Sequence, residues 1–329
     1  MTNASRVNRY SWLKGDSITT ISLMVSFLAL CVFFSTQTEF FFSLSNASNL
    51  ARTLAVVGIS SIGMTLVLIS GGVDISVGSV AALSGVLASL FWLEFSMPLG
   101  LSTVLALVCC TLVGLLNGLI ITVLKINPLI TTLATFSIVR GLAFVISEGQ
   151  TNQLNNAAFT YIGRGTLLGL PFSLILMLLL YLIFTFILRS TPFGRNLYAI
   201  GGSPEKSRLA GINVNRHLLI SYTLCSFLAG LAGLIIAAQL ASSAPRAATG
   251  LEFTVITAVV LGGTSLAGGK GSLLGTLVGV IILRVLDNGL VLMEVSSFYQ
   301  EVARGLVLLL AVSFDQIRLG LSRLRRRSV

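Results

Sequence analysis

"SITTISLMVSFLALCVFFS", residues 17–35, is an apolar run long enough to cross a membrane as a single helix. The hydrocarbon core of a bilayer is about 30 Å thick, and a helix needs about 20 apolar residues to cross it. A secretory signal peptide has a shorter apolar region, about 7–15 residues, that ends at small residues. This run is longer and ends in Phe33-Phe34-Ser35. We therefore interpret it as a retained first membrane span.

The composition extends this interpretation to the whole chain. Of its 329 residues, 55% are hydrophobic and only 10% are charged, and the mean hydropathy is +0.96. Soluble domains carry about 25% charged residues, so this chain has too few charges to cover a globular surface. Most of its exterior is expected to face lipid. The predicted fold class is an all-α polytopic membrane protein.

Apolar runs recur along the chain and predict about ten transmembrane helices. They lie near 17–35, 53–70, 76–93, 99–123, 128–147, 166–188, 217–240, 252–268, 272–292 and 298–315. The orientation follows from Lys and Arg, which concentrate in short cytoplasmic loops. If the N-terminus is inside, fifteen of the 21 basic residues fall in cytoplasmic segments and at most four fall outside. Both termini are therefore predicted to be cytoplasmic.

The same assignment gives three parts to the chain. Residues 1–16 form a cytoplasmic N-terminal segment, residues 17–315 the transmembrane domain, and residues 316–329 a basic cytoplasmic tail. The net charge of +10 belongs mainly to the cytoplasmic face, where basic side chains meet anionic lipid headgroups. No folded basic module is left over, so binding to nucleic acid is not expected.

The stretch "GGTSLAGGKGS", residues 262–272, resembles a nucleotide-binding loop but fails the motif. That motif has Gly, four residues, then Gly-Lys followed by Ser or Thr, because the hydroxyl holds magnesium. Counting back from Gly269-Lys270, Thr264 occupies the position of the first glycine. Gly271 stands where the hydroxyl is required. The chain itself is not expected to bind ATP.

Residue types that carry catalysis or bind metals are sparse. The four cysteines lie within apolar runs without metal-ligand spacing, and His217 is the one histidine. Buried or lipid-facing cysteine side chains account for this pattern. With no Ser/His/Asp or Cys/His arrangement, the sequence predicts no catalytic site, no metal and no cofactor.

Two polar interruptions of the apolar pattern resemble each other. "SGGVDISVGS" (70–79) and "LGGTSLAGGKGS" (261–272) each have a Gly-Gly pair, Gly71-Gly72 and Gly262-Gly263, and a Gly-Ser restart. Glycine-broken segments in corresponding places can mark a transport pathway, although two short interfacial turns would give the same pattern. Asp74 in the first interruption is costly within a membrane. It could cap the following helix or act as a gating contact.

The longest predicted cytoplasmic segment is "RSTPFGRNLYAIGGSPEKSRLAGINVNR", residues 189–216. Turn residues occur at 192–194 and 201–204. A short helix is predicted to start at Pro204, a favoured first-turn residue, and to end before Gly211. A connector needs only a few residues. The extra length is enough to present a docking element to a cytoplasmic partner.

At these residues the chain resembles the permease subunits of bacterial ABC importers for carbohydrates, the group that contains the ribose permease. The resemblance covers nearly the whole chain. Its specific parts are "GMTLVLISGGVDISVGSVAALSG" (63–85), "FGRNLYAIGGSPEKSRLAGINV" (193–214), "VVLGGTSLAGGKGSLLGTLVGVIIL" (259–283) and "NGLVLMEVSSFYQ" (288–300).

The resemblance implies a multi-pass protein of the bacterial inner membrane that forms a pore with a second permease subunit, identical or paralogous. It also implies a cytoplasmic ATP-binding subunit and a periplasmic sugar-binding protein. The family's coupling loop carries Glu-Ala-Ala, three residues, then Gly, and here it falls on Glu205, Lys206, Ser207 and Gly211. The two alanines of that pattern are replaced.

A secondary transporter or channel for a small polar solute is the main alternative function. Such proteins often place paired ionisable residues within spans, whereas the predicted spans here hold few such residues, among them Arg284 and Arg304. A membrane enzyme is disfavoured by the missing catalytic arrangement. A sugar path would use hydroxyl and amide groups, so Asn117, Asn127, Thr131 and Asn288 are candidates. Each of these side chains could equally form a hydrogen bond that holds two packed helices together.

Overall fold

The computed structural model describes residues 11–327, with side chains described for residues 23–313. The helices are α1 (Ser11–Gln37), α2 (Leu44–Ile69), α3 (Val77–Ser89) with the π-helical turn η1 (Leu90–Glu94), α4 (Leu99–Val123), α5 (Pro128–Ile146), α6 (Ala157–Arg164), α7 (Phe172–Ser190), α8 (Pro192–Gly202), α9 (Pro204–Leu209), α10 (Val214–Leu240), α11 (Leu251–Leu261), α12 (Leu273–Leu292) and α13 (Ser297–Arg327). Four two-residue strands, β1 (Asn152–Gln153), β2 (Thr166–Leu167), β3 (Leu170–Pro171) and β4 (Ser242–Ser243), pair antiparallel as β1–β4 and β2–β3.

The predicted all-α polytopic class is confirmed. The residues assigned to the N-terminal segment before position 11 lie outside the described residues.

Each predicted span overlaps a helix, and α4 has the predicted bounds. The sixth span, predicted from residue 166, starts too early because β2 and β3 precede α7. Among the described residues, seven helical segments are long and apolar enough to cross a membrane: α2, α3 with η1, α4, α5, α7, α10 and α12. Helix α11 has 11 residues. At 1.5 Å per residue it covers about half of a ~30 Å hydrocarbon core. The total of ten spans therefore stays a prediction.

The eighth predicted span is longer than the helix that the structure shows. The prediction ran over 252–268, whereas α11 ends at Leu261. Gly262 closes the helix, and Gly263 has φ +89°, a left-handed conformation that glycine adopts without steric cost. The predicted boundary was wrong because the glycines end the helix instead of continuing it.

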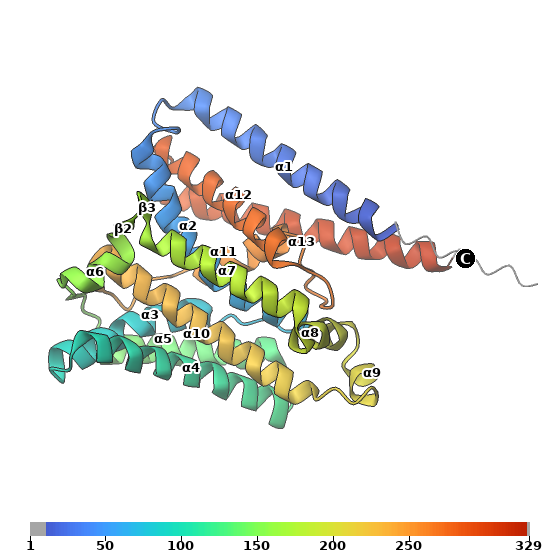
Figure 1. Cartoon of the computed structure of the whole chain (residues 1–329), viewed down its shortest axis with the longest axis horizontal. Helices are drawn as coiled ribbons and strands as arrows, with labels where there is room; N and C mark the ends of the chain where they lie inside the picture. Colours follow the sequence, from blue (N-terminus) through green and yellow to red (C-terminus); the bar gives the residue numbers. More distant parts are fainter. Residues whose placement is uncertain (1–10, 328–329) are drawn as a thin grey trace, which may run out of the picture.

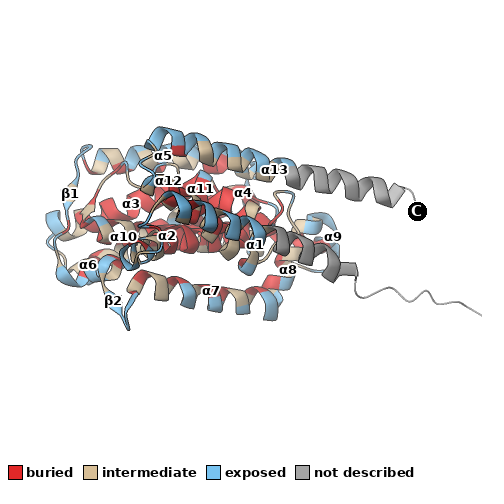
Figure 2. Ribbon diagram, turned by 90° about the horizontal axis from the view of Figure 1, so that it is seen from above, coloured by how far each residue is buried: buried red, intermediate tan, exposed pale blue. Residues whose placement is uncertain are grey.

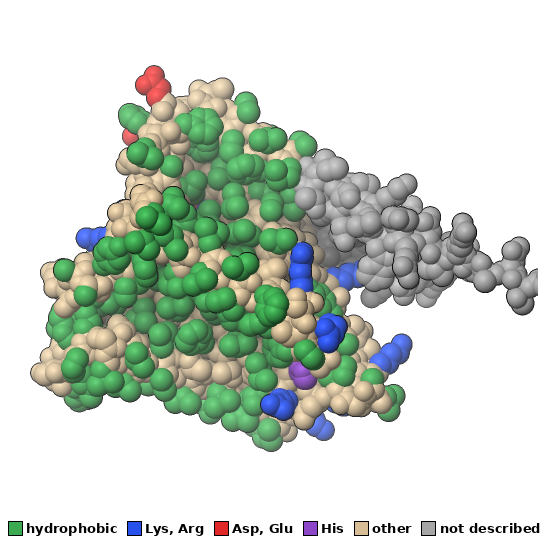
Figure 3. Space-filling view, viewed as in Figure 1, with side chains coloured by type: hydrophobic (Ala, Val, Ile, Leu, Met, Phe, Trp, Pro, Cys, Tyr) green, Lys and Arg blue, Asp and Glu red, His purple; other side chains and the backbone are tan. Residues whose placement is uncertain are grey.

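The buried centre of the molecule consists of α2, α3, α10 and α11 (Figure 2). Helices α4, α5 and α7 surround it and expose large apolar side chains such as Leu116, Ile138 and Leu182. Apolar side chains cover much of the visible face (Figure 3). An exterior of this kind is stable against lipid, so the composition and the burial pattern agree.

The two ends of the helical body are different. Helix α6 and the paired strands lie at one end, and α8 and α9 lie at the other, toward which α13 runs (Figure 1). Lys and Arg side chains gather at the α8–α9 end (Figure 3). The polar interruptions that follow α2 and α11 come to this end as well, which positions the candidate site.

Candidate functional site

The two polar interruptions lie against each other in space. The N–H of Gly269 donates to the carbonyl oxygen of Ile69 over 2.9 Å, which joins residues 261–272 to the end of α2. The sequence predicted their similarity. Their direct contact is a tertiary feature that the sequence pattern did not predict.

This contact depends on glycine at several positions. Gly71 and Gly268 are left-handed, with φ +86° and +82°, and a Cβ on Gly268 would come 2.8 Å from the Cα of Gly71. Gly201, near the end of α8, sits against the carbonyl of Ile69 so closely that a Cβ would overlap it. Two glycine-containing turns and the end of α8 thus meet at the α8–α9 end of the molecule.

Two of the other glycines of the pairs, Gly72 and Gly262, lie in close helix contacts. A Cβ on Gly72 would overlap the hydroxyl of Tyr222, and one on Gly262 would overlap the backbone of Gly275 at the start of α12. Gly263 faces open space. Close packing therefore accounts for Gly72 and Gly262, whereas backbone conformation accounts for Gly71 and Gly263.

The structure gives a steric reason why residues 262–272 depart from the nucleotide-binding motif. Thr264 and Gly271, the two positions that fail the motif, touch each other: a Cβ on Gly271 would come 2.6 Å from the hydroxyl oxygen of Thr264. A serine or threonine at position 271 would meet this side chain. The loop is a packed turn of the membrane domain.

Asp74 lies at one end of a chain of hydrogen-bonded polar groups. Its carboxylate is fully buried, and Oδ1 accepts hydrogen bonds from the N–H of Ser76 (2.9 Å) and from its hydroxyl (2.5 Å). The Asn117 amide of α4 donates to the Ser76 hydroxyl over 3.2 Å. Thr135 of α5 in turn donates to Asn117 Oδ1 over 2.6 Å. These bonds connect the start of α3 to α4 and α5.

The remaining candidates on α5 are at its first turn. Asn127 is exposed and caps the helix by accepting the N–H of Leu129 over 2.9 Å. Thr131 is buried, and its hydroxyl has no hydrogen-bond partner within the described residues. Thr131 lies one helical turn before Thr135, and so it neighbours the Asp74–Asn117 chain along α5.

Asn288 is in a separate place. It exchanges two side-chain hydrogen bonds with Asn46 of α2, at 2.7 and 2.9 Å. This reciprocal amide pair joins α12 to the beginning of α2. The structure brings Asp74 and Asn117 together but leaves Asn288 apart from them. The roles of all these candidates in a pathway stay predictions.

Helix α9 spans Pro204–Leu209, as the sequence predicted for this segment. The hydroxyl of Ser203 caps it by accepting the N–H of Lys206 over 3.3 Å and donates to Glu205 over 3.2 Å. Ser207 is buried and donates to the Ser203 carbonyl over 2.9 Å. Glu205 and Lys206 are exposed. The helix therefore presents a charged outer face, while Ser207 lies on its buried inner face.

The end of α9 has two features that suit a docking element. Gly211 has φ +80° and open space around it. Glycine is therefore required at this position by the left-handed backbone and not by close packing. The side chain of Leu209 is 89% exposed on this otherwise polar helix. Single exposed apolar side chains are common on protein surfaces, so Leu209 supports docking only together with the projecting position of α9. The sequence analysis did not single out Leu209, although an apolar residue in "PEKSRL" was a visible signal.

Helix α8 holds α9 against the membrane domain. The sequence suggested a turn at 192–194, but Pro192 begins a helix whose N-cap is Thr191. Proline suits the first position of a helix because its missing N–H would be unpaired there. On α8, Asn196 contacts His217 of α10 over 3.1 Å, and Phe193 stacks on the same imidazole with 5.6 Å between ring centroids.

Asp287 is an ionisable residue that the sequence analysis missed. It is 4% exposed and forms ion pairs with Arg284 (3.0 Å) and Arg304 (3.2 Å). The spacing of Arg284 and Asp287 by three residues places them on one helix face, and that signal was available. Among the described residues, no group of three His, Cys, Asp or Glu side chains lies close enough to hold a metal ion.

Comparisons with known proteins point to one family. The family model described as "Branched-chain amino acid transport system / permease component" matches residues 46–312. The ribose import permease of Escherichia coli (strain K12) is 41% identical over 89% of this chain and 92% of its own length. The ribose import permease of Bacillus subtilis (strain 168) is 43% identical over 82% and 84%. The L-arabinose transport system permease of Escherichia coli (strain K12) is 37% identical over 89% and 88%. No solved structure matches this chain.

Proposed function

Because the chain belongs to the family of branched-chain amino acid transport system permease components, we propose that it carries a sugar, ribose or a related monosaccharide, across the bacterial inner membrane. Permeases of this type are transport subunits and not enzymes. They work with an ATPase and a periplasmic binding protein. Relatives named for ribose and for L-arabinose, each covering most of this chain, support a monosaccharide as substrate.

The observation that carries the proposal is the projecting α9. A six-residue helix with an exposed Glu205, Lys206 and Leu209 stands out from the membrane domain and ends at a left-handed Gly211. The same segment backs onto α8 and, through Gly201, onto the end of α2. In this proposal the ATP-binding subunit binds α9 and moves it. Helix α8 moves with α9 and shifts the glycine-containing turns that it contacts.

Further parts of the proposal concern the arrangement in the membrane. Ten spans with both termini in the cytoplasm are supported by the distribution of Lys and Arg and by the α8–α9 end of the molecule. Residues 1–16 and 316–329 would lie on the cytoplasmic side, the latter against anionic lipid, with the permease domain between them. A second permease subunit, identical or paralogous, would complete the pore. Asp74, Asn117 and Thr131 are the proposed pathway or gate residues.

Copurification tests this proposal. The chain is expressed with its binding protein and ATP-binding subunit, extracted in mild detergent, and purified through a tag on the chain. The ATP-binding subunit should copurify in stoichiometric amount. Uptake of the same labelled sugar by the chain alone, with no ATP-binding subunit present, would instead support a secondary transporter or channel.

A further inference from the structure

A cavity of about 230 Å³, lined by both apolar and polar side chains, lies between five helices in the half of the molecule away from α8 and α9. Its wall includes Thr53 in the N-terminal half of α2, Gln239 in the last turn of α10 and Thr254 in the first turn of α11. Arg284 of α12 and Arg304 of α13 complete it. At about 30 Å³ of liquid volume per water, the cavity has room for roughly eight waters.

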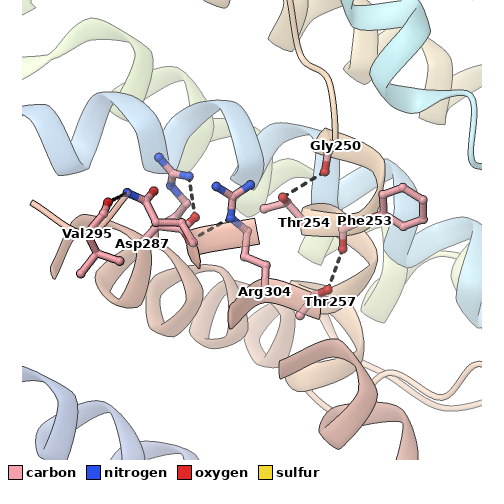
Figure 4. A network of polar contacts seen from close by, with 9 residues as sticks. Gly250, Phe253, Thr254, Thr257, Asp287, Val295 and Arg304 are labelled. Carbon is pink, nitrogen blue, oxygen red and sulfur yellow. Dashed lines mark hydrogen bonds and ion pairs between the residues drawn. The ribbon is translucent and has the colours of Figure 1, made fainter. Parts of the chain in front are cut away.

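The two arginines are held in place by Asp287, and Figure 4 shows Asp287 beside Arg304. Arg284 Nη1 lies 3.0 Å from Asp287 Oδ2, and Arg304 Nε lies 3.2 Å from Asp287 Oδ1. Charged side chains within membrane spans are costly, and where they occur they commonly mark a functional site. One carboxylate fixes two guanidinium groups, each of which carries five N–H donors. Donors on both arginines therefore remain for a ligand.

The other polar groups of the wall are arranged as acceptors. The Thr254 hydroxyl donates to the Gly250 carbonyl over 3.1 Å, and the Thr249 hydroxyl donates to the Arg246 carbonyl over 2.7 Å. Each hydroxyl uses its O–H in this bond, so its oxygen lone pairs remain to accept hydrogen bonds from a ligand. Gln239 uses one of its two side-chain N–H groups on the Arg52 carbonyl over 3.0 Å, which leaves its amide oxygen to accept and one N–H to donate.

A wall that combines guanidinium donors with hydroxyl oxygens free to accept matches a polyhydroxylated solute. Each sugar hydroxyl offers one donor and two acceptor sites, so it can bond to both kinds of group at once. We propose that this cavity is a binding site for a monosaccharide in the outer half of the permease, contacted by Arg284, Arg304 and Thr254. This assignment rests on the proposed function.

Protection from alkylation tests the site directly. Thr249 is exposed at the cavity mouth, so Thr249→Cys, in a full-length chain with Cys31 and Cys109 replaced by Ala, should react with a water-soluble maleimide. The transported sugar should slow that reaction in a concentration-dependent way. The matched control is Arg246→Cys, which is exposed in the same segment but outside the cavity. Its labelling should be unaffected by the sugar.

A pair of threonines on α11 then tests the contact. Thr254→Val removes an acceptor from the cavity, whereas Thr257→Val removes the equivalent hydroxyl one turn later. Both are buried and bond the carbonyl four residues back, at 3.1 and 2.7 Å, but only Thr254 lines the cavity (Figure 4). Thr254→Val should raise the sugar concentration needed for protection about fivefold, the effect of one net hydrogen bond. Thr257→Val should leave it unchanged.

The outcomes separate this inference from the proposed function. If the wild-type transporter takes up a labelled sugar but that sugar does not protect Thr249→Cys, the cavity assignment is wrong and the function stands. Protection by inorganic phosphate or acetate without protection by sugar would show an anion site and overturn the assignment. If no monosaccharide is taken up at all, the proposed function itself fails.

Discussion

The hydroxyl of Tyr198 on α8 donates a hydrogen bond of 2.8 Å to the carbonyl oxygen of Gly271, in the turn that leads into α12. This bond directly joins the segment that carries α9 to the second glycine-rich interruption. Burial raises the pKa of the Tyr198 hydroxyl above its usual value, with Arg189 partly opposing the effect. The hydroxyl therefore stays protonated and keeps its donor role across the physiological pH range.

Removing this bond should weaken the coupling between ATP hydrolysis and transport. Tyr198→Phe loses one net hydrogen bond, about 1 kcal/mol, and should reduce sugar uptake per ATP about fivefold at unchanged membrane abundance. Tyr161→Phe is the matched control. It removes a hydroxyl-to-carbonyl bond of 3.0 Å to Thr166 at the opposite end of the molecule. Equal coupling ratios in the two variants would contradict a role for the Tyr198 bond.

Gly211 should be intolerant of a β-branched side chain. Its φ of +80° costs an L-residue about 1–2 kcal/mol, while the space around it is open. Gly211→Val should therefore displace α9 and abolish uptake without lowering the amount of protein in the membrane. Gly202→Val provides the comparison, because Gly202 also has open space but lies outside the left-handed region. Normal uptake by Gly211→Val at normal abundance would refute the coupling assignment of α9.

Leu209 should contribute to binding of the ATP-binding subunit. Its exposed side chain would be buried in that contact, and full burial of a leucine is worth about 1.5–3 kcal/mol. Leu209→Glu should reduce copurification of the ATP-binding subunit at least tenfold, by about 1.4 kcal/mol or more. Leu168→Glu serves as the control, since Leu168 is 93% exposed in the turn between β2 and β3 at the opposite end. Retention of the subunit by the Leu209 variant would show that α9 docks elsewhere or not at all.

The proposed orientation predicts opposite labelling of two exposed positions. Lys206→Cys on α9 should react with an impermeant thiol reagent only after the cytoplasmic membrane is opened. Asn155→Cys, between β1 and α6, should react in intact cells whose outer membrane alone is permeabilised. If Lys206→Cys is the one that labels in those intact cells, the chain is inverted.

The sequence predicted those helix ends and turns that depend on neighbouring residues in the chain. The bounds of α4 follow from an apolar run between Pro98 and Lys125, which fixes both ends without reference to other helices. The short helix at Pro204 and the turn at Gly211 follow from local backbone preferences. Helix α8 was missed because Pro192 marks a turn and the first residue of a helix equally well.

Tertiary features were beyond the sequence pattern. Nothing in the residues around Gly71 or Gly268 indicates which distant backbone they approach, because glycine supplies room without specifying what fills it. The ion pair of Arg304 with Asp287 joins two helices and depends on how α13 packs on α12. In contrast, the pairing of Arg284 with Asp287 has a three-residue spacing within one helix and could have been predicted.

The most direct test of the account is uptake of labelled ribose and a panel of related monosaccharides into proteoliposomes. They contain the chain with its ATP-binding subunit, and the loaded periplasmic binding protein is added outside. We expect at least one sugar to accumulate. This accumulation should require enclosed ATP and both partners, and collapse of the proton and sodium gradients should not affect it. Accumulation that persists without ATP and disappears when the ion gradients collapse would contradict the account.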